Sequence, residues 1–154
     1  MDDSHKPPAH AGAAQAVSPE TAFVLAADDA RLLTEVGFLA AGAGDVARAE
    51  TIFKALRRLR PGAAYPLIGL AVAWMNAARA PEAVALLETA VLADPGERAL
   101  LDAWRGFALQ LAGRNGESRR LLESIALGEG AGEGATLARG LLGLPREGAG
   151  HVRR

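Results

Sequence analysis

The feature of this sequence that most restricts its fold is a repeat of 34 residues. Pro61 and Pro95 lie 34 positions apart, and each ends a segment with the same order of small and large apolar residues. The matched positions are Leu33, Val36, Gly37, Ala40, Ala49, Phe53 and Leu56 in the first segment and Leu67, Leu70, Ala71, Trp74, Ala83, Leu87 and Ala90 in the second. A period of this length is typical of two-helix units that bury their apolar faces by stacking on their neighbours.

A third and weaker copy follows at an offset of 35 residues. It carries Gly106 and Ser118 where the two helices of a unit must approach closely, and Leu122 and Ile125 as the large side chains. The period and the order of residues resemble those of tetratricopeptide repeats. We therefore predict an all-α fold, a right-handed solenoid of about three helix-turn-helix units with flexible termini.

Gly, Pro and Asp or Asn residues separate the apolar segments and predict where the helices end. The expected helices cover residues 19–42, 46–59, 65–79, 81–93, 97–112 and 116–127, with a short seventh helix over 134–142 that its glycines weaken. Ser18 and Pro19 suit a helix start. We expect a disordered tail over 1–17, a repeat domain over 18–127 with units at 30–63, 64–97 and 99–127, and a Gly-rich tail over 128–154.

Composition argues against several classes of function. Seventeen basic and eighteen acidic residues give a net charge of −1, which offers no electrostatic attraction for nucleic acid. Cysteine is absent, so no thiolate metal site or thiol nucleophile is expected. The first ten residues do not have the pattern of a secretory signal, and we expect a cytoplasmic protein with no membrane insertion.

No catalytic motif is evident, and we expect neither an enzyme nor a cofactor or metal site. His5, His10 and His151 all lie in the predicted tails, without a rigid setting for a metal or for acid–base chemistry. The segment Gly42-Ala43-Gly44-Asp45-Val46-Ala47 fits the G-x-G-x-x-A dinucleotide pattern, but a helix rather than a strand is predicted before it. We interpret it as a turn between helices.

Basic residues gather on the second helix of the first unit: Lys54, Arg57, Arg58 and Arg60. They are able to contact phosphate or an acidic partner. The apolar residues of the same helix account for its buried face, so we favour a solvated face that complements the helix dipole.

The first helix of each unit has a second face that would line the concave side of the solenoid. In register, it comprises Arg31, Thr34, Phe38, Ala41, Tyr65, Ile68, Val72, Met75, Leu100, Ala103, Phe107 and Gln110. Only Arg31 is charged, so we expect a groove that binds an apolar or amphipathic segment. The predicted binding residues are Phe38, Tyr65, Ile68, Val72, Met75, Ala103 and Phe107. The alternative is that Ile68, Val72 and Phe107 complete the core.

Residues 30–127 also resemble the tetratricopeptide-repeat chaperones of bacterial type III secretion systems. The resemblance lies in the repeat positions, in Ala49-Glu50-Thr51-Ile52-Phe53-Lys54-Ala55-Leu56 with Leu59 and Pro61, and in Leu67-Ile68-Gly69-Leu70-Ala71-Val72-Ala73. It implies a cytoplasmic chaperone that keeps a translocator, needle or apparatus-assembly client soluble before export. It also implies a protein client, and a second small chaperone or a homodimer as further partners. A general repeat scaffold outside secretion is the alternative function.

Overall fold

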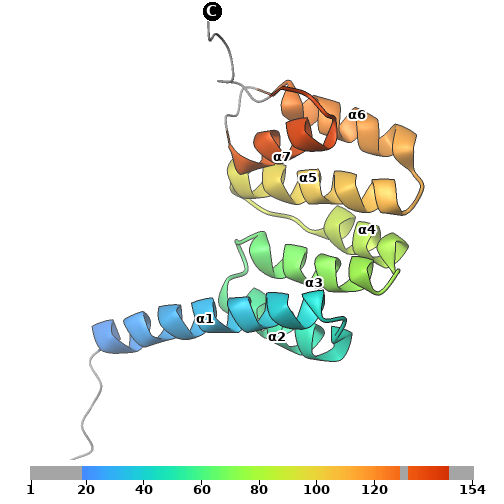
Figure 1. Cartoon of the computed structure of the whole chain (residues 1–154). Helices are drawn as coiled ribbons and strands as arrows, with labels where there is room; N and C mark the ends of the chain where they lie inside the picture. Colours follow the sequence, from blue (N-terminus) through green and yellow to red (C-terminus); the bar gives the residue numbers. More distant parts are fainter. Residues whose placement is uncertain (1–18, 129–131, 146–154) are drawn as a thin grey trace, which may run out of the picture.

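The computed structural model describes residues 19–128 and 132–145, and within these ranges every regular element is a helix. The helices are α1 (Pro19–Gly42), α2 (Val46–Leu59), α3 (Tyr65–Asn76), α4 (Ala80–Thr89), α5 (Pro95–Leu111), α6 (Asn115–Ala126) and α7 (Glu133–Leu141). They form three hairpins that stack in chain order, with α7 added at the far end (Figure 1). The all-α repeat solenoid that the sequence predicts is confirmed.

Local sequence explains most helix ends. The carboxylate of Asp45 accepts a hydrogen bond from the amide of Arg48, and that of Asp94 accepts one from Glu97, so each caps the helix that follows. Proline stands in the first turn of α3, α4 and α5, where its missing N–H costs nothing.

Two predicted helices are too long. The helix over 65–79 ends at Asn76, because Ala78 adopts a left-handed backbone with φ of 59° that a helix cannot continue through. The helix over 81–93 ends at Thr89, where Ala90 turns to an extended conformation. The other predicted ends agree with the structure to within two residues, including the short helix α7.

Close approach between repeats depends on glycine opposite a large side chain. Phe53 of α2 is fully buried, and a Cβ atom placed on Gly69 of α3 would lie 2.2 Å from its ring. A Cβ atom on Gly106 of α5 would lie 2.5 Å from Leu122 of α6 in the same way. Phe53 thus fills the interface with the next repeat, and the predicted close approach of the two helices at Gly106 is confirmed.

The core is continuous along the stack. One cluster of buried residues joins α3, α4 and α5, another joins α1, α2 and α3, and a third joins α5, α6 and α7. Polar side chains also join neighbouring helices: Asn76 donates to the carbonyl of Ala41 at 3.0 Å, and Ser118, which is fully buried, donates to the carbonyl of Gly106 at 2.7 Å.

Helix α7 lies in the segment that the sequence predicts as a Gly-rich tail. It contacts both α5 and α6, and its backbone comes so near to α5 that a Cβ atom on Gly134 would lie 2.5 Å from the carbonyl carbon of Ala99. Ala135 and Ala138 are buried with it. The small residues that weaken this helix in isolation are therefore the ones that let it pack. The predicted tail over 1–17 lies outside the described residues.

Candidate functional site

The first helices of the three repeats lie one above another and make up one side of the stack (Figure 1). Helix α3 contacts both α1 and α5, while α2, α4 and α6 each pack between or beyond them. The face that the sequence predicts as a groove is carried by α1, α3 and α5. Two pockets open along these helices, one at each end of the stack.

The pocket at the α1 end, called here the α1 pocket, has a volume of about 490 Å³. Arg31, Thr34 and Tyr65 line it, and all three belong to the predicted groove face. Its remaining walls are mostly alanine, with Glu35 and Arg60 at the side. Arg31 pairs with Glu35 at 3.3 Å, which leaves the pocket apolar inside with charged groups around it.

The pocket at the other end, called here the α7 pocket, has a volume of about 580 Å³. Leu100 of α5 forms one wall, and α7 supplies most of the rest through Thr136, Leu137, Gly140 and Leu141. Leu100 occupies the same register in its repeat as Arg31 and Tyr65 do in theirs. The two pockets therefore mark the two ends of one face.

Four of the seven predicted binding residues have accessible surface. Phe38 is 37% exposed and meets the ring of Phe53 edge to face, with centroids 5.0 Å apart. Tyr65, Val72 and Phe107 are half-buried. Phe107 meets Trp104 edge to face at 6.0 Å, so Trp104 adds to the aromatic surface of α5 although the register did not include it.

The other three predicted residues lie in the core, which corrects the expected lining of the groove. Ile68 is 4% exposed and Met75 is 9% exposed, and both belong to the cluster that joins α3, α4 and α5. Contact between α3 and α5 closes this part of the face. Ala103 is fully buried, because α7 covers it and packs Ala138 into the same cluster. Of the three residues in the alternative that completes the core, Ile68 belongs to the core cluster, whereas Val72 and Phe107 are half-buried and pack against it.

Arg60 lines the candidate site, although the sequence analysis does not assign it to the groove face. It follows the last turn of α2 and is exposed like the other basic residues of that helix, but it also lines the α1 pocket together with Arg31. The only hint in the sequence is its position at a helix end, where the chain turns toward α3. Lys54, Arg57 and Arg58 are exposed, as the sequence predicts for a solvated face.

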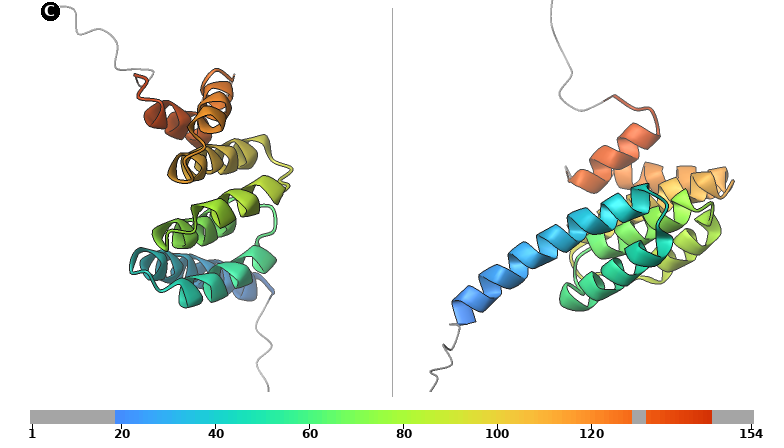
Figure 2. Two further views of the ribbon diagram at one scale, coloured as in Figure 1. Left: turned by 90° about the vertical axis from the view of Figure 1, so that its right-hand side faces the viewer. Right: turned by 60° about the horizontal axis from the view of Figure 1, so that its bottom comes forward.

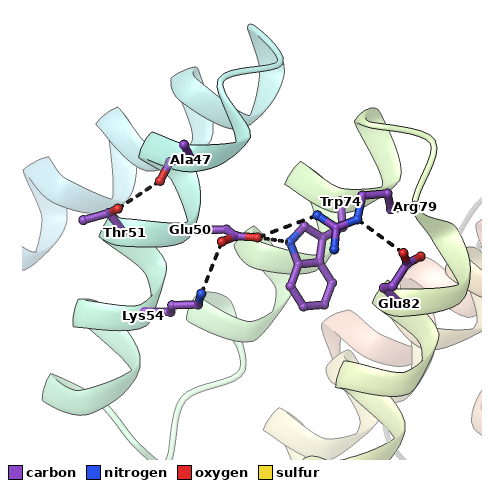
Figure 3. Close-up of polar contacts among 7 residues, drawn as sticks. All are labelled: Ala47, Glu50, Thr51, Lys54, Trp74, Arg79 and Glu82. Carbon is purple, nitrogen blue, oxygen red and sulfur yellow. Dashed lines mark hydrogen bonds and ion pairs between the residues drawn. The ribbon is translucent and has the colours of Figure 1, made fainter.

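A polar cluster links α2 to α3 and to the turn that leads into α4 (Figure 3). The indole N–H of Trp74 donates to Glu50 at 2.6 Å, Lys54 donates to the same carboxylate at 3.2 Å, and the guanidinium of Arg79 lies 5.2 Å from the Trp74 ring centre. The hydrogen bond from Trp74 is the main cause that lowers the pKa of Glu50, against the opposing effect of burial. These contacts join the first repeat to the second.

The glycine-rich segment over 42–47 is a turn between α1 and α2. Gly44 has φ of +76°, and the next residue, Asp45, caps α2. A helix precedes the turn, so the strand that a dinucleotide site needs is not there. The three histidines lie outside the described residues.

A comparison with known protein families finds a match over part of the chain. Residues 40–106 match the family model described as "Tetratricopeptide repeat". No curated protein and no solved structure matches the chain. The match supports a tetratricopeptide-repeat protein, and such repeats are non-catalytic scaffolds that bind protein partners.

In the described part of the chain, none of the helices combines the length and the apolar character that crossing a membrane requires.

Proposed function

We propose that this chain is a cytoplasmic chaperone of a bacterial type III secretion system. It holds an apolar or amphipathic helical segment of a client protein against the face formed by α1, α3 and α5. The match to tetratricopeptide repeats supports the protein-binding part of this proposal. The secretion part rests on the resemblance of residues 49–61 and 67–73 described above.

The observation that carries the binding site is the row of partly exposed apolar side chains between the two pockets. Phe38, Tyr65, Val72 and Phe107 come from three successive first helices, and Leu100 adds an aliphatic wall at the far pocket. An apolar segment laid along this row would remove their surface from water at about 25 cal/mol per Å². Recognition of this kind suits an amphipathic helix in a groove.

The α1 pocket adds charged groups to one end of this otherwise apolar face. Its interior is mostly alanine with the ring of Tyr65, while Arg31 and Arg60 stand at its wall. A client segment that ends there is expected to bring an apolar side chain for the pocket, with polar groups near the two arginines.

The proposal is tested by replacing one side chain in each pocket. Tyr65→Glu combined with Leu100→Glu places carboxylates where the client's apolar groups would lie, and both side chains already reach solvent. Affinity capture from cells of the source, followed by mass spectrometry, should recover a secretion-apparatus subunit or translocator with the wild-type chain and lose it with the variant. Far-UV circular dichroism should remain helical.

The matched control is Leu59→Glu combined with Val91→Glu, two exposed apolar residues that line neither pocket. It should capture the client as well as the wild type does. Capture that persists in the Tyr65 and Leu100 variant would reject this face as the site. Specific capture of proteins that have no part in secretion would instead favour the general repeat scaffold.

A further inference from the structure

The second and third repeats meet around a small cavity, called here the α4 pocket. Its volume is about 220 Å³, and its walls come from α4, α5 and the beginning of α6. On α5, Leu109 of this pocket stands two residues after Phe107 of the groove face, and so about 200° further round the helix. The α4 pocket therefore opens on a different side of the stack from the proposed groove. It is lined by Val84, Glu88, Arg105, Leu109, Arg114, Glu117, Arg120 and Leu121.

The same arrangement of helices occurs one layer earlier in the stack, where α2, α3 and the beginning of α4 meet (Figures 1 and 2). This place is called here the first junction, and the surroundings of the α4 pocket the second junction. Ala78 and Gly113 are 35 positions apart and have positive φ angles of 59° and 77°, so they mark the same turn in the two repeats. The register pairs Glu50 with Val84, Lys54 with Glu88, Trp74 with Leu109, Arg79 with Arg114 and Glu82 with Glu117.

At the first junction, the chain itself provides an aromatic ring (Figure 3). The N–H of Trp74 donates to the carboxylate of Glu50 at 2.6 Å, and the guanidinium of Arg79 lies 5.2 Å from the centre of the ring. Glu82 accepts a hydrogen bond of 3.3 Å from Arg79 and so helps to keep that guanidinium in place. The ring thus has a cation on its face and a carboxylate at its edge.

The second junction keeps the cation but has no ring. Arg114 donates two hydrogen bonds to Glu117, of 2.8 and 2.6 Å, which hold its guanidinium as that of its counterpart is held. Leu109 takes the position of the tryptophan, and with Val84 it forms a buried apolar floor. Glu117 chiefly, and Glu88 to a smaller extent, raise the pKa of Arg114, so both carboxylates lie near this guanidinium.

The charges around the α4 pocket balance one another. Its three arginines stand beside three carboxylates, those of Glu88 and Glu117 in the lining and that of Asp102, which pairs with Arg105 at 3.5 Å. A ligand with a net charge therefore gains little. The guanidinium, the apolar floor and the exposed carboxylate of Glu88 suit a neutral ring that has a hydrogen-bond donor at its edge.

We infer that the α4 pocket binds the side chain of a tryptophan or tyrosine of a protein partner. The ring lies between the guanidinium of Arg114 and the floor of Leu109 and Val84, and its N–H or O–H donates to Glu88. The residues outside the described ranges include no Phe, Tyr or Trp, so none of them supplies this ring. Repeats of this kind bind proteins, and a cavity of this size holds one ring rather than a whole small-molecule ligand. The inference does not depend on the client or on the groove face.

The direct test is a titration of the full chain with N-acetyl-tryptophanamide, followed by ¹H–¹⁵N NMR. We expect the amide signals of Leu109, Arg114 and Leu121 to shift, with a Kd on the order of 1 mM. N-acetyl-leucinamide, which has no ring, should leave them in place. The tryptophan probe methylated on its indole nitrogen should bind several-fold more weakly, because it has no N–H to donate to Glu88.

Substitutions then test the role of each wall. Arg114→Gln should weaken binding of the tryptophan probe about fivefold, because it removes the cation from the face of the ring. The matched control is Arg119→Gln, at another ion-paired arginine near the beginning of α6 that does not line the α4 pocket. Leu109→Trp supplies the ring of the first junction from the chain itself and should abolish binding, with far-UV circular dichroism still helical.

Several results would overturn the inference. These are the absence of shifts at Leu109, Arg114 and Leu121, shifts confined to Tyr65 and Leu100 of the other two pockets, and an unchanged Kd for Arg114→Gln. Undiminished binding to a helical Leu109→Trp variant would count against it equally, and if that variant does not fold, the Arg114→Gln result decides. Binding of free indole together with exclusion of N-acetyl-tryptophanamide would show a site for a small molecule, and not for the side chain of a protein.

Discussion

The two ends of the helix stack end in different ways. At the α7 end, small residues let a short helix lie directly on α5 and α6, with Ala138 fully buried and Gly134 against the backbone of α5. At the α1 end, the outermost helix presents leucine and valine to solvent. Small side chains allow a neighbouring helix to pack at close range, as α7 does on α5. One end, called here the sealed end, is thus covered within the chain, whereas the other, called here the open end, leaves large apolar side chains exposed among the described residues.

The largest effect is expected from a charge at the sealed end. Ala138→Asp places a carboxylate among Ala103, Leu122 and Ala126, where it has neither water nor a cation. We expect the free energy of unfolding to fall by about 3 kcal/mol or more in urea titrations.

The corresponding change at the open end is Leu39→Asp. It should change the free energy of unfolding by no more than about 0.5 kcal/mol, because Leu39 is already 73% exposed. Equal costs at the two positions would mean that α7 is not a packed cap.

A smaller effect separates the middle of the stack from its sealed end. Gly69→Ala would place a methyl group 2.2 Å from the ring of Phe53, and the overpacking is expected to cost about 1–3 kcal/mol despite alanine's better helix propensity. Gly140→Ala, on α7 with no atom within 4 Å of the new Cβ, should instead stabilise by up to about 1 kcal/mol. Thermal unfolding of the two variants should shift in opposite directions; a gain from Gly69→Ala would show that the interface between α2 and α3 is loose.

The smallest effect concerns the contact between Glu50 of α2 and Trp74 of α3, next to the open end. Glu50 has its pKa lowered from 4.5 in the folded chain, chiefly by the hydrogen bond from Trp74. A lowered folded pKa means that the stabilisation is complete above the unfolded value and is lost as the pH falls through the folded value. Glu50→Gln should therefore cost about 1 kcal/mol at pH 7, and the difference from wild type should shrink below pH 4.

Urea titrations at several pH values check this dependence. The control is Glu35→Gln, an exposed ion pair with Arg31, which is expected to cost less than about 0.5 kcal/mol at pH 7. A gap between wild type and Glu50→Gln that stays constant at all pH values would contradict the role given to the carboxylate.

The hairpins were predictable because the same kinds of residue recur at matching positions of successive units. Phe53 and Gly106 stand at positions where one unit must meet the next or fold on itself, and the structure places them as expected. The period does not show which residues of a terminal unit lack a neighbouring unit to pack against. Leu32 and Leu101 occupy the same position of the repeat, but the first is exposed and the second is buried, because burial depends on a neighbour rather than on the residue.

The candidate site was predicted less well for the same reason. The register placed Ile68, Met75 and Ala103 on an open face, but contact between α3 and α5 and the addition of α7 bury all three. A period assigns faces to a helix as though each unit were identical. It does not give the distance between successive first helices, which decides how much of the face remains open.

The junction between Glu50 and Trp74 also has no counterpart further along the stack. Val84 and Leu109 occupy the matching positions, and both are buried in the apolar core. One tryptophan of the chain therefore lies beside a carboxylate and a guanidinium, and the other, Trp104, lies against Phe107. Their fluorescence should differ in its response to acid and to quenchers, so each half of the chain carries its own natural optical probe of unfolding.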